Sequence, residues 1–327
     1  MCRGKFRSSG RMSMTRTLIM FCGQGAQYYQ MGRELHHADP IFRDAMDRCE
    51  TIAADLGGPR IADVIFGRPM AESQGFDRLA ESNAALLAIG FALATRLEAA
   101  GIAPDALLGY SLGETIAAVF AGALSLEDGF RLVLGQADIF ARAAPAGAMI
   151  AVLVEPERLA ALPEATRLCE IAAINAPRHC VLSLRADDAA VVEAALERAG
   201  LTYARLPIRF PFHASAIAPV EPDMIRLASG CRFAPPRWPI VSATTGGVAE
   251  PFDGAHLWRV MRQPLRFRET IEALAREGDW LLLEAGPSGT LASFVRQIGA
   301  PGVAAFPAID QFGNNSATLA RLLAAAR

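Results

Sequence analysis

The 327 residues carry a formal net charge of −2, and 52% of them are hydrophobic while 20% are charged. This composition predicts a folded globular chain and gives no electrostatic support for nucleic-acid binding. The longest apolar run, residues 84–94, is too short to cross a bilayer, so no membrane association is predicted. The 6 cysteines are scattered without metal-binding spacing, which favours reduced thiols, no metal site and a cytoplasmic location.

The first elements predicted along the chain are a tail, a strand and two helical stretches. Residues 1–16 contain five basic residues and no acid, which predicts a disordered basic tail, with Met12 or Met14 as an alternative start. Residues 17–22 have the composition of a buried strand, and a glycine-containing turn at 23–27 follows. Helical patterns then cover about 31–56 and 80–100.

The sequence Gly109-Tyr110-Ser111-Leu112-Gly113 follows a short apolar strand at 106–108 and precedes a helical segment at 115–124. A G-x-S-x-G between a strand and a helix is typical of a nucleophile elbow. The serine then lies at the first helical turn, where unpaired N–H groups and the helix dipole stabilise an oxyanion. The motif predicts acyl transfer through an acyl-serine, and the alternative is a glycine-rich helix start with a capping serine.

The next predicted helix extends from an N-cap at Ser125 to about residue 143. After it, the order of predicted strands and helices changes. Strands at 148–154, 169–174, 180–184 and 202–208, with helices at 156–162 and 187–199, give the order βαββαβ of a ferredoxin-like unit. A strand at 240–243, a helix at 267–277 and a strand at 280–284 then resume the first pattern. We predict an α/β fold with a parallel-sheet core (17–147 and 209–327) and an inserted subdomain (148–208).

A serine nucleophile needs a base, and His213 is the strongest candidate among 5 histidines. It lies in Phe210-Pro211-Phe212-His213, just after the last strand of the insert, where the chain re-enters the expected cleft. Aromatic and proline neighbours would fix the ring and exclude water. An ordinary core or surface histidine is the alternative interpretation.

Six segments together resemble the malonyl-CoA:acyl carrier protein transacylases and polyketide synthase acyltransferases. They are FCGQGAQYYQMGREL (21–35), LLGYSLGETIAAVFAGALSLEDGFRLV (107–133), GAMIAVL (147–153), INAPRHCVLSL (174–184), FPFHAS (210–215) and LLLEAGPSGTL (281–291). The resemblance implies an α/β-hydrolase-like core with a ferredoxin-like insert. It also implies a nucleophilic Ser111, a basic His213 oriented by a backbone carbonyl around Val260, and an oxyanion site at Gln24 and the Leu112 N–H.

The resemblance further assigns Tyr110, Gln136 and Asn175 to substrate binding, and two of these depart from the family pattern. Tyr110 replaces the usual histidine before the nucleophile, which changes a pocket wall. Gln136 replaces the arginine that pairs with the carboxylate of a malonyl group. A neutral amide cannot compensate a buried anion, and an unpaired buried charge costs about 3–5 kcal/mol. Non-carboxylated acyl groups are therefore expected.

The favoured hypothesis is a serine acyl-enzyme acting on acyl thioesters of acyl carrier protein or coenzyme A in polyketide biosynthesis, with acyl hydrolysis favoured over transfer. One alternative is a malonyl-CoA transacylase in which Arg142 or Arg209 supplies the charge, and another is a carrier-protein-binding module without turnover. No metal or redox cofactor is expected. An acidic carrier protein is expected to meet basic residues near the cleft mouth, with four candidates: Arg178, Arg205, Arg209 and Arg237.

Overall fold

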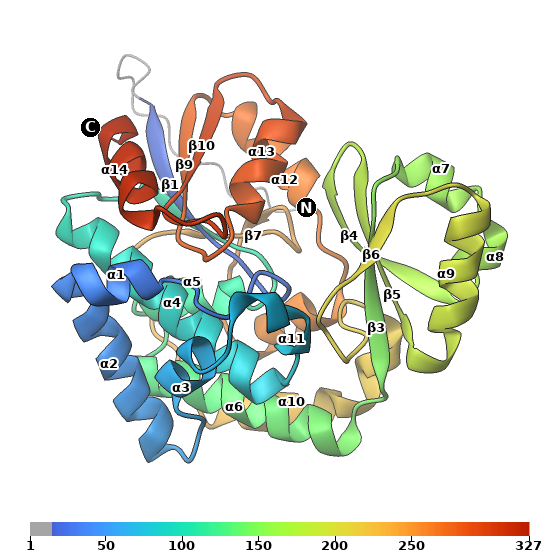
Figure 1. The fold of residues 1–327 in the computed structure, drawn as a ribbon, viewed down its shortest axis with the longest axis horizontal. Helices are drawn as coiled ribbons and strands as arrows, with labels where there is room; N and C mark the ends of the chain where they lie inside the picture. The colour runs from blue at the N-terminus through green and yellow to red at the C-terminus, as the bar shows by residue number, and fades with distance from the viewer. Residues whose placement is uncertain (1–14, 327) are drawn as a thin grey trace.

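The computed structural model describes residues 15–326, so the tail predicted at 1–16 lies almost wholly outside this range, and Arg16 already belongs to the first strand. The chain forms a large body around a six-stranded sheet and a smaller body around a four-stranded sheet (Figure 1). Each body has its own buried apolar cluster. Between residues 15 and 326, no helix combines the length and apolar character needed to cross a bilayer.

The larger sheet has the strand order β10-β9-β1-β2-β7-β8 and is parallel except for the β7–β8 pair. Its strands are β1 (Arg16–Phe21), β2 (Ala106–Gly109), β7 (Ile240–Ser242), β8 (Gly247–Val248), β9 (Trp280–Glu284) and β10 (Val303–Pro307). Phe21 pairs with Gly109 and Gly109 with Ser242, so β1, β2 and β7 end side by side. The carboxyl ends of parallel strands are where such sheets bind ligands.

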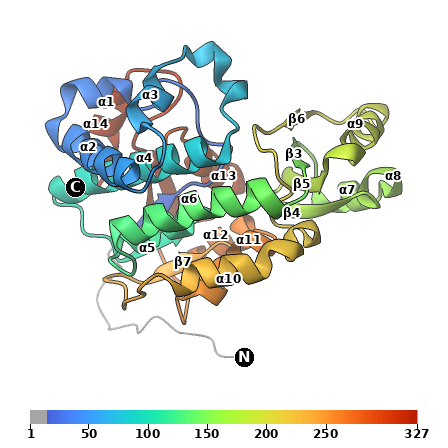
Figure 2. The same cartoon turned by 90° about the horizontal axis from the view of Figure 1, so that it is seen from below.

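Helices surround this sheet, and α6 passes along one side of the large body toward the small sheet (Figure 2). The helices of the large body are α1 (Arg33–Ala38), α2 (Pro40–Asp55), α3 (Ile61–Phe66), η1 (Met70–Gly75), α4 (Leu79–Ala99), α5 (Gly113–Phe120), α6 (Leu126–Ala143), η3 (Ser215–Val220), α10 (Glu221–Ser229), α11 (Gly254–Arg262), α12 (Phe267–Ala275), α13 (Thr290–Ile298) and α14 (Asn315–Ala325). The predicted stretch 31–56 is two helices, because Asp39 precedes Pro40 and is extended.

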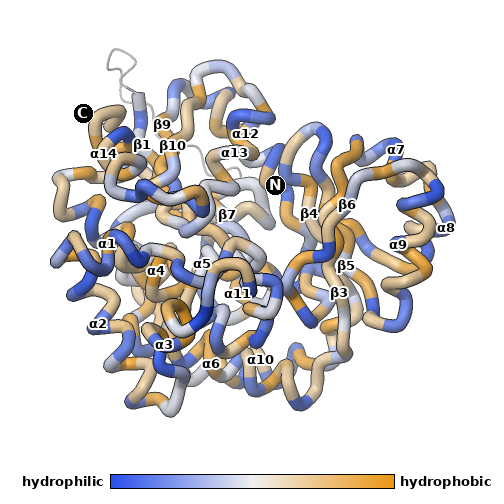
Figure 3. Tube along the Cα trace, in the orientation of Figure 1, coloured by the Kyte–Doolittle hydropathy of each residue, from blue (hydrophilic) through white to orange (hydrophobic). Residues whose placement is uncertain are grey.

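The smaller sheet is antiparallel with the order β4-β5-β3-β6, which confirms the predicted ferredoxin-like insert. Its elements are β3 (Gly147–Val152), α7 (Pro156–Ala160), α8 (Pro163–Thr166), β4 (Cys169–Ala176), β5 (His179–Arg185), η2 (Ala186–Asp188), α9 (Ala189–Arg198) and β6 (Tyr203–Arg205). Figure 3 shows hydrophobic residues along β3 and β5 and mixed hydropathy along α9. The last strand is shorter than the predicted 202–208, and the residues after Arg205 lead back toward the larger sheet.

Candidate active site

Ser111 lies in the tight turn between β2 and α5, with a left-handed backbone (φ +57°) that non-glycine residues rarely adopt. The two flanking glycines make this turn possible. A Cβ on Gly109 would lie 2.4 Å from Cα of Glu114, and one on Gly113 would lie 2.0 Å from the carbonyl oxygen of Phe21. The elbow is therefore pressed against the end of β1, and the strained turn presents the serine at the carboxyl edge of the sheet.

His213 is in hydrogen-bond contact with Ser111, with its Nε2 2.9 Å from the serine Oγ. Its Nδ1 lies 2.9 Å from the carbonyl oxygen of Gln263, and its backbone N–H donates to the Met261 carbonyl at 2.8 Å. A carbonyl oxygen can only accept, so Nδ1 carries the proton and the Nε2 lone pair faces the serine hydroxyl. In the part of the chain that the structure describes, no carboxylate contacts the ring.

The orienting carbonyl belongs to Gln263, whereas the sequence analysis placed it around Val260. Helix α11 ends at Arg262, and Gln263 is extended because it precedes Pro264. Its carbonyl therefore leaves the helix direction and meets the imidazole. Burial lowers the pKa of His213 to about 4, and hydrogen bonding to the carbonyls of Gln263 and Val260 offsets part of that shift. The ring is consequently neutral at pH 7 and can accept a proton.

Two backbone donors lie beside the serine. Among residues 15–326, the N–H groups of Gln24 and Leu112 have no hydrogen-bond partner, and both residues line a cavity together with Ser111. The side-chain amide of Gln24 is already occupied, because its Nε2 donates to Oδ1 of Asn83 at 2.6 Å. Asn83 is fully buried on α4 and in turn donates to the Val133 carbonyl on α6. Sequence analysis missed Asn83, which carries no motif.

Two cavities flank the serine. The first, called here the helix-side cavity, is bounded by α6, α10 and α11, and its volume is about 40 Å³. Its walls are mostly apolar and include these side chains: Leu132, Val133, Met224, Ala228, Leu257 and Met261. The second, the sheet-side cavity, lies against β3, β4 and β5 and includes Met149, Ala173 and Val181. No Asp, Glu, Lys or Arg from the described part of the chain lines either cavity.

Gln136 and Tyr110 line these cavities, whereas Asn175 lies behind one of them. Gln136 is on α6, is only 8% exposed and lines the helix-side cavity, and its side-chain amide forms no hydrogen bond with any residue in 15–326. Tyr110 lines the sheet-side cavity, and its hydroxyl donates to Oδ1 of Asn175 at 2.9 Å. Asn175 is buried and lines neither cavity, so it contacts the tyrosine and positions it.

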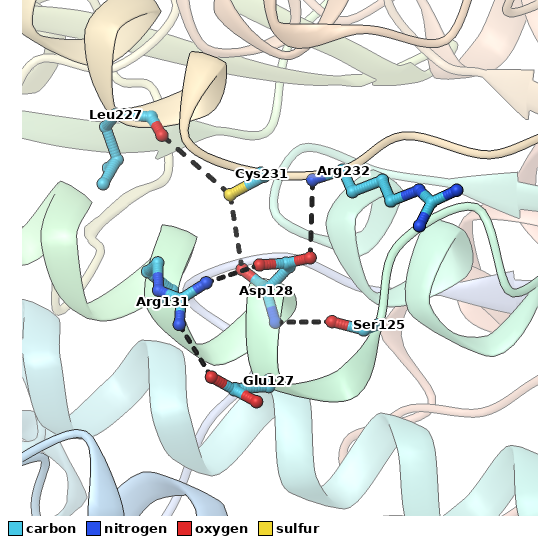
Figure 4. Close-up of polar contacts among 7 residues, drawn as sticks. All are labelled: Ser125, Glu127, Asp128, Arg131, Leu227, Cys231 and Arg232. Carbon is cyan, nitrogen blue, oxygen red and sulfur yellow. Dashed lines mark hydrogen bonds and ion pairs between the residues drawn. The ribbon is translucent and has the colours of Figure 1, made fainter.

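Arg131, five residues before Gln136 on α6, does not line the helix-side cavity and belongs instead to a polar cluster near the start of α6 (Figure 4). Its guanidinium donates to Glu127 and to Asp128, at 2.7 Å each. Asp128 also accepts from the Arg232 backbone N–H at 3.4 Å, which joins the start of α6 to the segment after α10. This cluster holds together two of the helices that wall the cavity and supplies no charge to its interior.

The arginines considered as substitutes for the family arginine are also elsewhere. Arg142 donates to the Asp138 carbonyl of its own helix, and Arg209 forms an ion pair with Asp77 at 2.7 Å. Neither lines a cavity next to Ser111. The geometry thus gives no support to a malonyl site completed by either arginine.

The four arginines predicted to meet a carrier protein do not gather at the cleft mouth. Arg237 precedes β7, forms an ion pair with Glu98 and stacks over Trp238, so it lies at the amino ends of the strands, opposite Ser111. Arg178 pairs with Glu155. The remaining two, Arg205 and Arg209, line a surface depression next to the sheet-side cavity, but each is paired with an acid.

Comparison with known proteins decides the family of this chain. A model of the family described as "Acyl transferase domain" matches residues 19–305. The chain belongs to this family. It is thus an acyltransferase-family enzyme, as the six sequence segments indicated.

Two relatives from polyketide biosynthesis show how the match differs with the length of the relative. The chain is 35% identical to the polyketide biosynthesis acyltransferase homolog PksD of Bacillus subtilis, over 86% of this chain and 87% of that protein. It is 34% identical to the polyketide biosynthesis protein ThaF of Burkholderia thailandensis, over 93% of this chain. There the match spans only 26% of the relative.

Solved structures share the whole fold. A loading acyltransferase from the avermectin modular polyketide synthase is 27% identical with a TM-score of 0.85, covering 94% of this chain and 99% of that one. A protein described as MCAT from Streptococcus pneumoniae is 29% identical with a TM-score of 0.78, covering 95% of this chain and 100% of that one. The predicted parallel core with its antiparallel insert is therefore confirmed for this acyltransferase.

Proposed function

We propose that this acyltransferase works through an acyl ester of Ser111, using acyl thioesters of acyl carrier protein or coenzyme A in polyketide biosynthesis. The polyketide role is supported by the relatives PksD and ThaF. His213 removes the hydroxyl proton through Nε2 as Ser111 Oγ attacks the thioester carbonyl. The tetrahedral oxyanion is held by the N–H groups of Leu112 and Gln24. Collapse breaks the C–S bond, the thiolate takes the proton from His213, and an acyl-Ser111 ester remains.

The preferred acyl group is non-carboxylated, and the environment of Gln136 is the observation that carries this proposal. The residue is buried in the helix-side cavity, where no charged side chain from residues 15–326 is available to pair with a carboxylate. A volume of about 40 Å³ accommodates about three water-sized groups, since one water needs roughly 10–15 Å³ on this scale. Short, uncharged acyl groups fit this description best.

The second half-reaction transfers the acyl group either to water or to a phosphopantetheine thiol. In both cases His213 deprotonates the incoming nucleophile, and the Ser111 oxygen leaves with a proton from the same imidazole. Both proton transfers use this one side chain, so the proposed reaction needs no metal or redox cofactor. We propose hydrolysis, which removes acyl chains from carrier proteins, as the main outcome, because this chain resembles the discrete trans-acting family members with glutamine in place of the arginine, and that resemblance implies an acyl hydrolase.

The decisive experiment compares acetyl- and malonyl-carrier protein as substrates, with mass spectrometry of the enzyme and quantification of free acid and transferred acyl group. We expect an acetyl adduct on Ser111, release of acetate in excess of transfer, and little reaction with malonyl. The Ser111→Ala variant controls for background hydrolysis and should form no adduct. Efficient malonyl transfer would contradict the assigned role of Gln136, and transfer without free acid would contradict the hydrolase outcome.

A further inference from the structure

A buried polar group lies directly beneath the nucleophile elbow. His256 Nε2 and Glu114 Oε2 are 2.6 Å apart, and the Ser242 hydroxyl donates to Oε1 of the same carboxylate at 2.5 Å. All three side chains are at most 1% exposed. Burial raises the pKa of Glu114, and the bonds to His256 and Ser242 offset part of that rise. Burying polar side chains this deep in an apolar core costs free energy, which their mutual hydrogen bonds offset only in part.

Glu114 and His256 each belong to a helix that carries or orients a residue of the proposed mechanism. Glu114 is in the first turn of α5, and its N–H donates to the carbonyl of Ser111 at 2.9 Å. His256 is in the first turn of α11, where the Asp253 side chain caps the helix by accepting from the His256 N–H at 2.7 Å. The contact between His256 and Glu114 therefore fixes the beginning of α11 to the helix that follows the nucleophile.

The other end of α11 holds the base. The Met261 carbonyl accepts from the His213 backbone N–H, and the Gln263 carbonyl lies 2.9 Å from His213 Nδ1. Helix α11 also packs against α5, α10 and η3, and four of its residues line the helix-side cavity. This one short helix thus spans from the nucleophile's helix to the two carbonyls that orient the imidazole.

We infer that the His256–Glu114 contact is a positioning element that sets the distance between Ser111 and His213 by anchoring α11. The inference rests on the proposed function, because it assigns the two residues a purpose only if Ser111 and His213 react together. Neither residue touches the substrate, so their effect passes through the Gln263 and Met261 carbonyls. A displacement of about 1 Å in such a site lowers rates by about 100-fold.

The test compares His256→Leu, which removes the donor, with His256→Gln, whose amide nitrogen reaches the position of Nε2. We expect the saturating rate of Ser111 acylation by acetyl-carrier protein to fall about 10- to 100-fold in the leucine variant. The concentration of acetyl-carrier protein that gives half of this rate should change less than about threefold. The glutamine variant should recover most of that rate. If the leucine variant does not fold, His256→Asn replaces it, because its shorter amide stops short of Glu114, and the same loss is expected.

A second readout does not depend on turnover. In ¹⁵N-histidine-labelled protein, the Nδ1 proton of His213 should give a hydrogen-bonded imidazole signal, identified by its loss in His213→Gln. We expect this signal to disappear or exchange rapidly in His256→Leu and to persist in His256→Gln. A general loss of stability would weaken the signals of many residues and would not affect the Nδ1 proton of His213 alone.

The matched control is Arg96→Gln, which removes the contact (2.5 Å) between Arg96 on α4 and Asp39, the N-cap of α2. Helix α11 packs against α5, α10 and η3, and not extensively against α2 or α4. The Arg96→Gln variant should lower the melting temperature without changing the acylation rate or the His213 signal. A folded His256→Leu variant with wild-type rate and signal would overturn the inference. If wild-type protein forms no Ser111 adduct, the proposed function fails, while the imidazole signal still reports whether α11 positions His213.

Discussion

Replacing Gln136 with arginine should shift the acyl preference of this enzyme from acetyl toward malonyl. Position 136 is 8% exposed on the wall of the helix-side cavity, next to Ser111. A guanidinium there could bind a malonyl carboxylate through two charge-assisted hydrogen bonds. The same carboxylate has no cationic partner among the described residues that line the cavity.

The magnitude follows from the cost of a buried charge without a partner, which is about 3–5 kcal/mol. Because Gln136 keeps 8% of its surface exposed, we take the lower end, about 3 kcal/mol, which corresponds to about 100-fold in rate. Gln136→Arg should therefore raise malonyl acylation of Ser111 by about 100-fold. Acetyl acylation should fall about tenfold, because the guanidinium is then left unpaired in an apolar cavity.

The assay is single-turnover acylation of Ser111 by malonyl- and acetyl-carrier protein, followed by intact-protein mass spectrometry. Asp138→Asn is the matched control, since it changes the net charge by the same amount on the same helix at an exposed position. It should leave both rates within about twofold, because surface charges are screened. An unchanged malonyl rate in a folded Gln136→Arg variant would refute the reasoning, as would an equal gain in the control.

Three further predictions concern the base, the elbow and the other arginines. Because the pKa of His213 is lowered to about 4, the imidazole stays neutral as the pH falls through the usual pKa range of histidine. Acylation should therefore decline only near pH 4, and a midpoint near 6.5 in the pH–rate profile would contradict this. Gly113→Ala should destabilise the fold by about 1–3 kcal/mol in urea unfolding, because its Cβ would lie 2.0 Å from the Phe21 carbonyl oxygen; an unchanged midpoint would count against that contact. Arg142→Gln and Arg209→Gln should each leave malonyl acylation unchanged, and a loss in either would revive the transacylase alternative.

The nucleophile elbow shows which structural features the local sequence can predict. A serine between two glycines, after an apolar strand and before a helix, allows few backbone conformations, so the turn at Ser111 could be predicted without a structure. The βαββαβ insert was predictable for a similar reason, because strand and helix periodicities are local. The short helices α10 and α11 were not predicted, and together with the predicted helix α6 they supply most of the wall of the helix-side cavity.

The sequence alone determined which groups are available: a serine hydroxyl on a tight turn, an imidazole after the insert, and an amide at position 136. Only the tertiary structure decided how they meet. The parallel register of β1 and β2 brings Gln24 beside Ser111, and the end of α11 turns the Gln263 carbonyl toward His213. Asn83 contacts Gln24, and Glu114 separately contacts His256. Backbone carbonyls and buried side-chain pairs depend on contacts between distant segments, which no local pattern of residues records.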